Sequence, residues 1–257
     1  MSDKEPKQDG TQAIRRAAAV LRIAAKGGDR GVSLRQVSEA TALSRSTAHR
    51  IVKCLMDEQL LHYDDEAKRY VVGDLVFELG LAAGGRSREI LRWRPLIDRL
   101  ARTCGATAYL IARSGHETVC LYKAEGGTVL RAIPVEVGQR RPLGVGAAAT
   151  ALLAATTDAD MERVLAAIAP HLKEFPRLSI EQIRLNVAAT RENGLTESRS
   201  FVAEGIYGLG MAIEPSSRPP TLAVSIAVHQ SLATDENIAA WKRHFADFRR
   251  QAADIAD

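Results

Sequence analysis

The chain has 257 residues, a formal net charge of +4 and an isoelectric point near 9.1. Because single hydrophobic cores rarely grow beyond about 250 residues, this length predicts a small domain and a larger one. Apolar residues make up 46% and charged residues 26%, which excludes a disordered or fibrous chain. No apolar run reaches the ~20 residues of a membrane-spanning helix, and the polar start resembles no secretory signal, so we expect a cytoplasmic protein.

Positive charge is concentrated near the N-terminus. Between Thr11 and Lys53 the chain has nine basic residues and two acidic ones, so this segment alone is more positive than the whole chain. A concentrated positive field neutralises phosphates and releases their counterions. The segment therefore predicts a nucleic-acid partner.

Three helices are predicted in this basic segment. The first has an apolar stripe and ends at Gly27-Gly28. A second helix of about two turns begins after Ser33, which forms a capping box with Gln36, and a third begins after Ser44. The stripe of the first helix consists of Ile14, Ala17, Ala18, Leu21 and Ala25.

The third helix has the pattern of a DNA-recognition helix. Ala48, Ile51, Val52 and Leu55 repeat at i, i+3, i+4 and i+7, which leaves polar and basic residues on the opposite face. Taken alone, such a face can simply be solvated, but its position after a short helix and a turn favours contacts in a major groove. We expect DNA contacts from Arg35, Ser44, Arg45, Ser46, Thr47, His49, Arg50, Lys53, Lys68 and Arg69.

A β-hairpin is predicted after the third helix. Leu60–Tyr63 and Arg69–Val72 alternate like strands and flank the polar tip at residues 64–68. This order of elements predicts a winged helix-turn-helix. The tip is acidic, so we expect it to point away from phosphate and assign contacts in this hairpin to Lys68 and Arg69 alone.

These segments resemble the IclR-type bacterial regulators. The resemblance rests on the runs Val32–Thr41, Leu43–Arg50 and Tyr70–Gly73. It implies a winged helix-turn-helix, then a GAF-like effector-binding domain, and assembly into a homodimer or homotetramer. Ala42 stands where the family usually has glycine, so the backbone there either avoids the left-handed region or carries strain.

A helical connector follows the hairpin. Leu75, Val76, Leu79 and Ala82 form a stripe, Gly84-Gly85 interrupts it, and a second helix runs past Leu100. The resemblance implies that the connector helps to form a dimer, which suits a protein that reads two half-sites, although an ordinary linker fits as well. We expect a disordered tail at residues 1–10, a DNA-binding domain at 11–74, a linker helix at 75–90, and an effector-binding and oligomerisation domain at 91–257.

The second domain is predicted to be α+β with an antiparallel sheet. Helices open at Asp158 and at Ser179, the latter with Gln182 as a capping-box partner. The strands group with helices between and after them rather than in strict alternation. The predicted strands are Ala108–Arg113, Thr118–Lys123, Val129–Pro134, Gly205–Ile213 and Leu222–Val228.

A glycine-containing loop at residues 144–149 has the spacing of a dinucleotide fingerprint. No buried strand is predicted before it and no acidic residue is well placed for a ribose, so we favour a helix N-terminus that holds a small anion over the fingerprint. A plain tight turn is the alternative.

The resemblance implies that this helix start lines the effector pocket. The positions that match are Ala147 and Ala148 on the helix, with Ser198, Gly208 and Ser225 on the facing sheet. Ala149-Thr150 replaces the usual Gly-Lys pair, and Gly208 lacks a side chain common in relatives. Tyr109, Tyr207 and Met211 are further candidates for the pocket lining or for plain core.

The last helix has one apolar stripe, from Ile238 to Ile255, which we expect to pack on the sheet, with an oligomer contact as the alternative.

Two other functions compete with DNA-binding regulation. A small-molecule-metabolising enzyme with an appended basic domain is the main alternative, but no catalytic, metal or cofactor motif is present, so we expect none of these sites. A redox sensor that uses Cys104 and Cys120 is less favoured. The sequence predicts a DNA-binding transcriptional regulator whose operator binding responds to a small organic acid.

Overall fold

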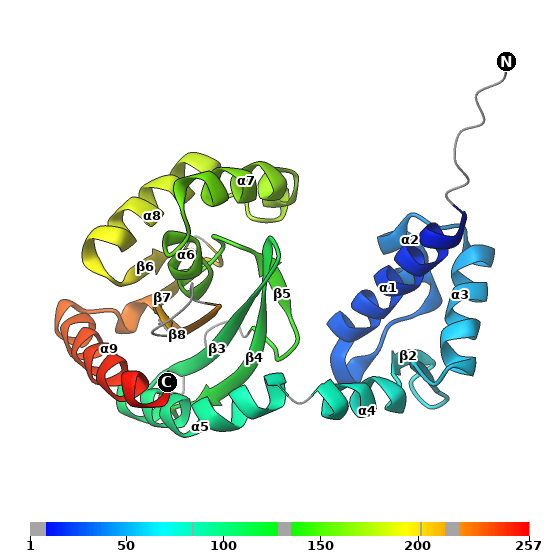
Figure 1. Ribbon diagram of the computed structural model, residues 1–257, viewed down its shortest axis with the longest axis horizontal. Coiled ribbons are helices and arrows are strands. Elements are labelled where there is room, and N and C mark those ends of the chain that lie inside the picture. The colour runs from blue at the N-terminus through cyan, green and yellow to red at the C-terminus, as the bar shows by residue number, and fades with distance from the viewer. Residues whose placement is uncertain (1–8, 84, 128–134, 201, 214–220, 257) are drawn as a thin grey trace, which may run out of the picture. The chain divides into compact units, whose positions relative to one another are not determined.

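The computed structural model describes residues 9–83, 85–127, 135–200, 202–213 and 221–256. The chain divides into two compact units, Met1–Ser87 and Arg88–Asp257. The first is mainly helical with a two-stranded hairpin, and the second contains a six-stranded antiparallel sheet (Figure 1). No helix in these ranges is long and apolar enough to cross a membrane. The strand predicted at Val129–Pro134 lies outside the described residues.

The first unit has the element order of a winged helix-turn-helix, as predicted. Two short strands pair antiparallel with Leu61 opposite Val72, and together they form the wing. An isolated bridge joins Val32, ahead of the second helix, to Tyr70 of the wing. The elements are α1 (Asp9–Gly27), a 3-10 turn (Gly28–Arg30), α2 (Leu34–Thr41), α3 (Arg45–Asp57), β1 (Leu61–Asp64), β2 (Arg69–Val72) and α4 (Asp74–Ala83).

The buried face of α1 differs from the predicted stripe. Val20 and Ala24 are fully buried and centre this face, whereas Ile14 is 70% exposed and Ala25 is also exposed. Ala17 and Leu21 of the predicted stripe do pack against this core, so the stripe was only partly misplaced. The alanine-rich sequence offers apolar residues on adjacent faces, so helical spacing alone fits more than one stripe. The capping box of Ser33 and Gln36 is formed as predicted.

The sheet of the second unit has the order β5-β4-β3-β8-β7-β6, and every neighbouring pair is antiparallel. Two of its edge strands, β5 and β6, were not predicted because three or four residues give too short an alternation to recognise. The strands are β3 (Thr107–Ser114), β4 (Glu117–Glu125), β5 (Arg140–Pro142), β6 (Thr196–Arg199), β7 (Ile206–Ile213) and β8 (Leu222–His229).

Helices cover both faces of this sheet (Figure 1). One face packs on α5 (Gly85–Cys104) and α9 (Asp235–Ala256), and the other on α6 (Ala147–Ala154), α7 (Asp158–Ile168) and α8 (Ile180–Asn193). The apolar stripe of α9 is buried in the first of these cores, which confirms that the last helix packs on the sheet.

The start of α8 corrects one detail of the prediction. The Ser179 side chain accepts a hydrogen bond from the backbone of Gln182, as a cap should. The Gln182 side chain donates instead to Asn186 at 3.0 Å, so only half of the predicted capping box is seen.

Candidate DNA interface and effector site

Helix α3 is buried on one face and exposes the other. Ala48, Val52 and Leu55 are buried in the core of the first unit, as predicted. On the opposite side the side chains are exposed, and Arg45, Arg50 and Lys53 make no ion pair within the described part of the chain. Unpaired cations on a helix of this fold are suited to phosphate and base contacts. The exposed side chains are Arg45, Ser46, His49, Arg50 and Lys53.

Hydroxyl groups gather at the N-terminus of α3. Ser44 Oγ accepts from the Thr47 amide at 3.3 Å and lies 3.1 Å from Ser46 Oγ and 2.9 Å from Thr47 Oγ1. This cap satisfies one of the free amides of the first turn. Ser44 and Thr47 therefore stabilise the helix start, and their contact with DNA stays a prediction.

The turn between α2 and α3 is left-handed at a residue that is not glycine. Ala42 has φ 53° and ψ 27°, and its amide donates to Glu39 and Ser38 carbonyls. The Leu43 amide and the Ser38 hydroxyl close the turn with further hydrogen bonds, at 3.2 and 2.6 Å. The backbone therefore adopts the conformation that favours glycine and carries the steric cost of the Ala42 Cβ.

The remaining predicted DNA contacts already have partners. Arg35 pairs with Glu39 at 2.9 Å, and Lys68 lies 3.8 Å from Asp65. Arg69 Nη1 donates to Gln36 Oε1 at 2.7 Å, which ties the wing to the start of α2. A phosphate at any of these three cations must share or displace its partner.

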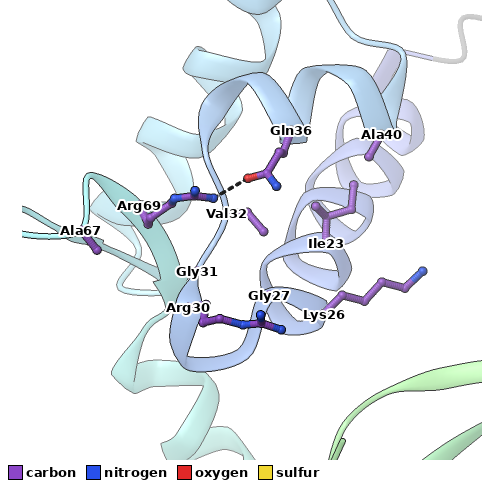
Figure 2. Close-up of a pocket in the computed structure, with 10 residues that line it drawn as sticks. All are labelled: Ile23, Lys26, Gly27, Arg30, Gly31, Val32, Gln36, Ala40, Ala67 and Arg69. Carbon is purple, nitrogen blue, oxygen red and sulfur yellow. Dashed lines mark hydrogen bonds between the residues drawn. The ribbon is translucent and has the colours of Figure 1, made fainter. Parts of the chain in front are cut away.

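A basic groove of about 710 Å³ lies beside this link (Figure 2). Its lining comes from α1, the 3-10 turn, α2 and the wing, and it contains the cations Lys26, Arg30 and Arg69. Sequence reasoning counted Lys26 and Arg30 in the positive segment but did not select them as site residues. The signal that could have found them was their position at the end of α1, next to the predicted wing.

The five predicted effector residues lie at one face of the second unit's sheet, three of them on its strands and Ala147 and Ala148 on α6. Ser198 is opposite Gly208 on neighbouring strands, and Ser225 is opposite Gly210. The start of α6 covers these strands, because a Cβ on Gly208 would lie 3.5 Å from the Ala147 Cβ. Ala148 follows on the same helix turn, so the structure brings all five together, while their role in binding stays a prediction.

The N-terminus of α6 is buried without a side-chain cap. Its N-cap residue is Gly146, which supplies no capping hydrogen bond, and every residue of the helix is buried. The free amides and dipole of such a helix start favour an anion. Thr150 donates its hydroxyl hydrogen to the Gly144 carbonyl at 2.9 Å and so braces the glycine loop.

Tyr207 and Met211 are core residues and do not line the face that α6 covers. Tyr207 and Met211 belong to the core beneath α9, and the Tyr207 ring lies 5.7 Å from Trp241. Side chains alternate along a strand, so a residue next to Gly208 must face away from α6. Tyr109, in contrast, lies in the core on the α6 side.

A strand does precede the glycine loop, but it is not the buried strand that the fingerprint requires. This strand, β5, is a half-buried edge strand that runs antiparallel to β4. The dinucleotide-binding fold requires a buried parallel strand at that place, so the dinucleotide fingerprint stays excluded.

The two buried thiols are protonated at neutral pH. Burial raises the pKa of Cys104 and of Cys120 to about 12. Because the thiolate is the reactive form, neither group is activated as a nucleophile or redox sensor. Among the residues that the structure describes, no cluster of His, Cys, Asp or Glu could hold a metal ion.

A winged helix-turn-helix followed by an α+β unit with a buried helix start defines a class of two-domain transcription regulators. A family model described as the IclR helix-turn-helix domain matches residues 13–65, and one described as bacterial transcriptional regulator IclR C-terminal matches residues 87–256. The chain belongs to the IclR family of bacterial transcriptional regulators.

Individual relatives match along most of their length. The chain is 30% identical over 230 residues to the HTH-type transcriptional regulator BhcR of Paracoccus denitrificans, covering 85% of this chain and 81% of that protein. The structure of an IclR transcriptional regulator from Alicyclobacillus acidocaldarius superposes with a TM-score of 0.77 at 21% identity, over 96% of this chain and 99% of that one. An IclR homolog from Microbacterium hydrocarbonoxydans complexed with 4-hydroxybenzoate has a TM-score of 0.72 at 18% identity, over 93% and 98%.

Proposed function

We propose that this regulator binds an operator through α3 and the wing, and that a small organic acid in the second unit shifts its DNA-binding equilibrium. The observation that carries the proposal is the exposed basic face of α3, whose cations Arg45, Arg50 and Lys53 have no ion-pair partner among the described residues. The buried, uncapped start of α6 supports the effector part. An effector acts only through its different affinities for the two DNA-binding states.

On the DNA side, we assign base contacts to the outer face of α3. Arg45 and Ser46 lie in its first turn, and His49, Arg50 and Lys53 follow along the exposed face. A bidentate arginine contact with guanine contributes about 1–3 kcal/mol of discrimination. Arg35, Lys68 and Arg69 serve as phosphate contacts, and Ser44 and Thr47 present the helix start to the backbone of the DNA.

On the effector side, the amides of Ala147 and Ala148 hold the anionic group and the hydroxyls of Ser198 and Ser225 hold further oxygens. Both serines are 8% exposed, on the sheet face that α6 covers. Gly208 leaves room beside Ala147. The homolog complexed with 4-hydroxybenzoate supports a small organic acid as the ligand class.

The proposal includes a dimer in the cytoplasm, with further assembly into a tetramer as an option. A helix-turn-helix that reads two half-sites requires two copies. The connector offers an apolar surface for this, because Phe77, Leu79 and Leu81 of α4 are 69%, 55% and 59% exposed. We place the functional boundary in the connector at residues 75–90, and assign no catalytic activity to either unit.

Alanine variants of α3 test the DNA assignment. Arg50→Ala and Lys53→Ala should weaken operator binding at fixed salt. If the lost side chain contacts a phosphate, the slope of log affinity against log salt concentration should also become smaller by about 0.9. Arg243→Ala, an exposed charge on α9, is the matched control. Binding of both α3 variants at the parent's affinity and slope would remove the assignment.

A Ser198→Ala, Ser225→Ala double variant tests the effector assignment. Its affinity for an effector should fall, while its affinity for DNA without effector should stay unchanged. Unchanged effector affinity would show that the two hydroxyls make no contact.

A further inference from the structure

The basic groove of the first unit has three cations and no acidic side chain among the described residues that line it (Figure 2). Lys26 comes from the last turn of α1, Arg30 from the 3-10 turn and Arg69 from the wing strand β2. A partner that carries negative charge therefore complements the groove. The apolar residues that also line it are Ile23, Val32, Ala40 and Ala67.

The positive charges of the groove are not neutralised within the described part of the chain. Lys26 and Arg30 are exposed and make neither an ion pair nor a hydrogen bond there. Arg69 donates to Gln36 Oε1 at 2.7 Å, but this neutral amide leaves the charge of the guanidinium uncompensated. By contrast, Arg35, which lies outside the groove, is paired with a carboxylate 2.9 Å away.

The backbone of the groove brings the 3-10 turn and the wing into close contact. Gly31 has φ 60°, and a Cβ on it would lie 2.8 Å from the Arg69 Cβ and 2.9 Å from the Tyr70 carbonyl oxygen. Val32 and Tyr70 then exchange two backbone hydrogen bonds, at 2.9 and 2.8 Å. The backbone of Arg30, the residue before Gly31, is therefore held next to the wing. Like charges on adjacent segments repel each other, and a bound anion offsets this repulsion.

Helix dipoles explain only part of this arrangement. Lys26 lies in the last turn of α1 and Arg30 at the end of the 3-10 turn, where a positive charge is favourable in itself. Arg69 comes from a strand, so no helix dipole accounts for its place in the same groove. A shared anionic partner accounts for all three.

The position of the groove beside α2 favours DNA as the partner. In a helix-turn-helix the first helix of the motif crosses the DNA backbone, while the second lies in the major groove. Here α2 is the first helix of the motif, and Gln36 and Ala40 on one side of it line the groove. Figure 2 shows Arg69 reaching toward Gln36, whereas Arg30 runs toward Gly27 at the end of α1. Cations at separate sides of one groove suit the successive phosphates of a strand better than one isolated anion.

We propose that the groove binds the sugar-phosphate backbone of duplex DNA next to the major-groove contact of α3. Lys26 and Arg30 hold phosphates together with Arg69. This inference rests on the proposed DNA-binding function and extends the contact with DNA to the end of α1. Because phosphate contacts carry no sequence information, these cations supply affinity, whereas α3 supplies specificity.

A Lys26→Gln, Arg30→Gln double variant of the full-length protein tests the proposal. Fluorescence anisotropy across a salt series measures its affinity for two duplexes, the sequence most enriched from a genomic pool (the selected duplex) and a scrambled version of it. Each lost contact should reduce the slope of log affinity against log salt concentration by about 0.9, or roughly 8-fold in affinity between 1 M and 0.1 M salt. Both duplexes should lose affinity by the same factor, so that their affinity ratio stays unchanged.

Two control variants separate a groove contact from a general effect of charge. Arg102→Gln, Arg243→Gln removes two exposed charges from the second unit and should keep the parent's slope. Lys26→Arg, Arg30→Lys keeps both charges of the groove and should bind like the parent. An unchanged slope in the glutamine variant of the groove, or an equal fall in the control, would overturn the proposal.

Methylphosphonate links, which are uncharged, locate the contact on the DNA. Replacement of single phosphates in the selected duplex should weaken binding by the parent at a few positions beside each half-site. The same replacements should have no further effect on the glutamine variant, because its partner charges are already absent. Additive losses at every position would overturn the proposal.

The two duplexes distinguish this inference from the proposed function. Equal affinity of the parent for both, with a slope that depends on Lys26 and Arg30, would support the groove contact and contradict sequence-specific regulation. A preference for the selected duplex, with an unchanged slope in the glutamine variant, would support the regulator and contradict the groove contact. Loss of pyrophosphate binding in that variant, with DNA binding unchanged, would assign the groove to a small anion and overturn the proposal.

Discussion

Gly210→Ala probes the contact on which the effector face depends. A Cβ at this position would lie 2.9 Å from both the Ala147 carbonyl carbon and the Ala148 nitrogen, all backbone atoms that no rotamer change can move. Ordinary contact begins near 3.4 Å, so the start of α6 must move away from the sheet by about half an ångström.

The expected cost follows from overpacking of a buried contact. Such insertions cost about 1–3 kcal/mol of unfolding free energy, which for a unit of this size lowers the melting temperature by about 2–12 °C. Gly208→Ala is the matched control, two residues along the same strand. Its Cβ would meet nothing closer than 3.5 Å, so alanine there should be neutral or stabilise by up to about 1 kcal/mol.

Tryptophan fluorescence during chemical unfolding is a suitable assay. Both tryptophans of the chain, Trp93 and Trp241, are buried in the second unit, so the signal reports on that unit alone. Equal stability of Gly210→Ala and the parent, or an equal loss in Gly208→Ala, would refute the reasoning about the α6 contact.

Four further predictions concern a helix cap, the turn and the buried thiols. Ser44→Ala should cost about 0.5–2 kcal/mol and speed hydrogen exchange of the first α3 amides; unchanged exchange would contradict its role as a cap. Ala42→Gly should stabilise α2 and α3 by about 1 kcal/mol, because glycine relieves the left-handed strain, and should therefore slow hydrogen exchange of their amides. Faster exchange would contradict this. At pH 8 a thiol reagent should modify exposed Cys54 quickly and Cys104 and Cys120 only on unfolding. Burial raises the folded-state pKa of both thiols to about 12. The contribution of these thiols to stability is therefore complete below about pH 9 and should be lost between pH 9 and 12. Denaturant titrations that show no loss of stability across this range would contradict this.

The DNA-binding unit was predictable because local signals agree with one another. Ser33 and Ser44 cap the two helices of the motif, and the apolar repeat from Ala48 to Leu55 fixes the exposed face of α3. The links that join elements were not predictable. The hydrogen bond from Arg69 to Gln36 connects residues 33 positions apart, and no local pattern encodes it.

The effector face was predictable only in part. Resemblance supplied Ser198, Gly208 and Ser225, and the structure places them on one face of the sheet. Strand alternation could have excluded Tyr207, because it adjoins Gly208 on the same strand. Arg141 lies on the short edge strand β5, whose three residues are too few for a sequence pattern to reveal.

Selection from a pool of genomic fragments tests the central claim most directly. Purified protein would be incubated with the pool across a salt series, and the retained fraction sequenced. The account predicts enrichment of one inverted-repeat motif, with affinity that falls steeply as salt increases and with the motif lost in Arg50→Ala. Uniform retention, or none, would contradict the assignment of α3 as a recognition helix.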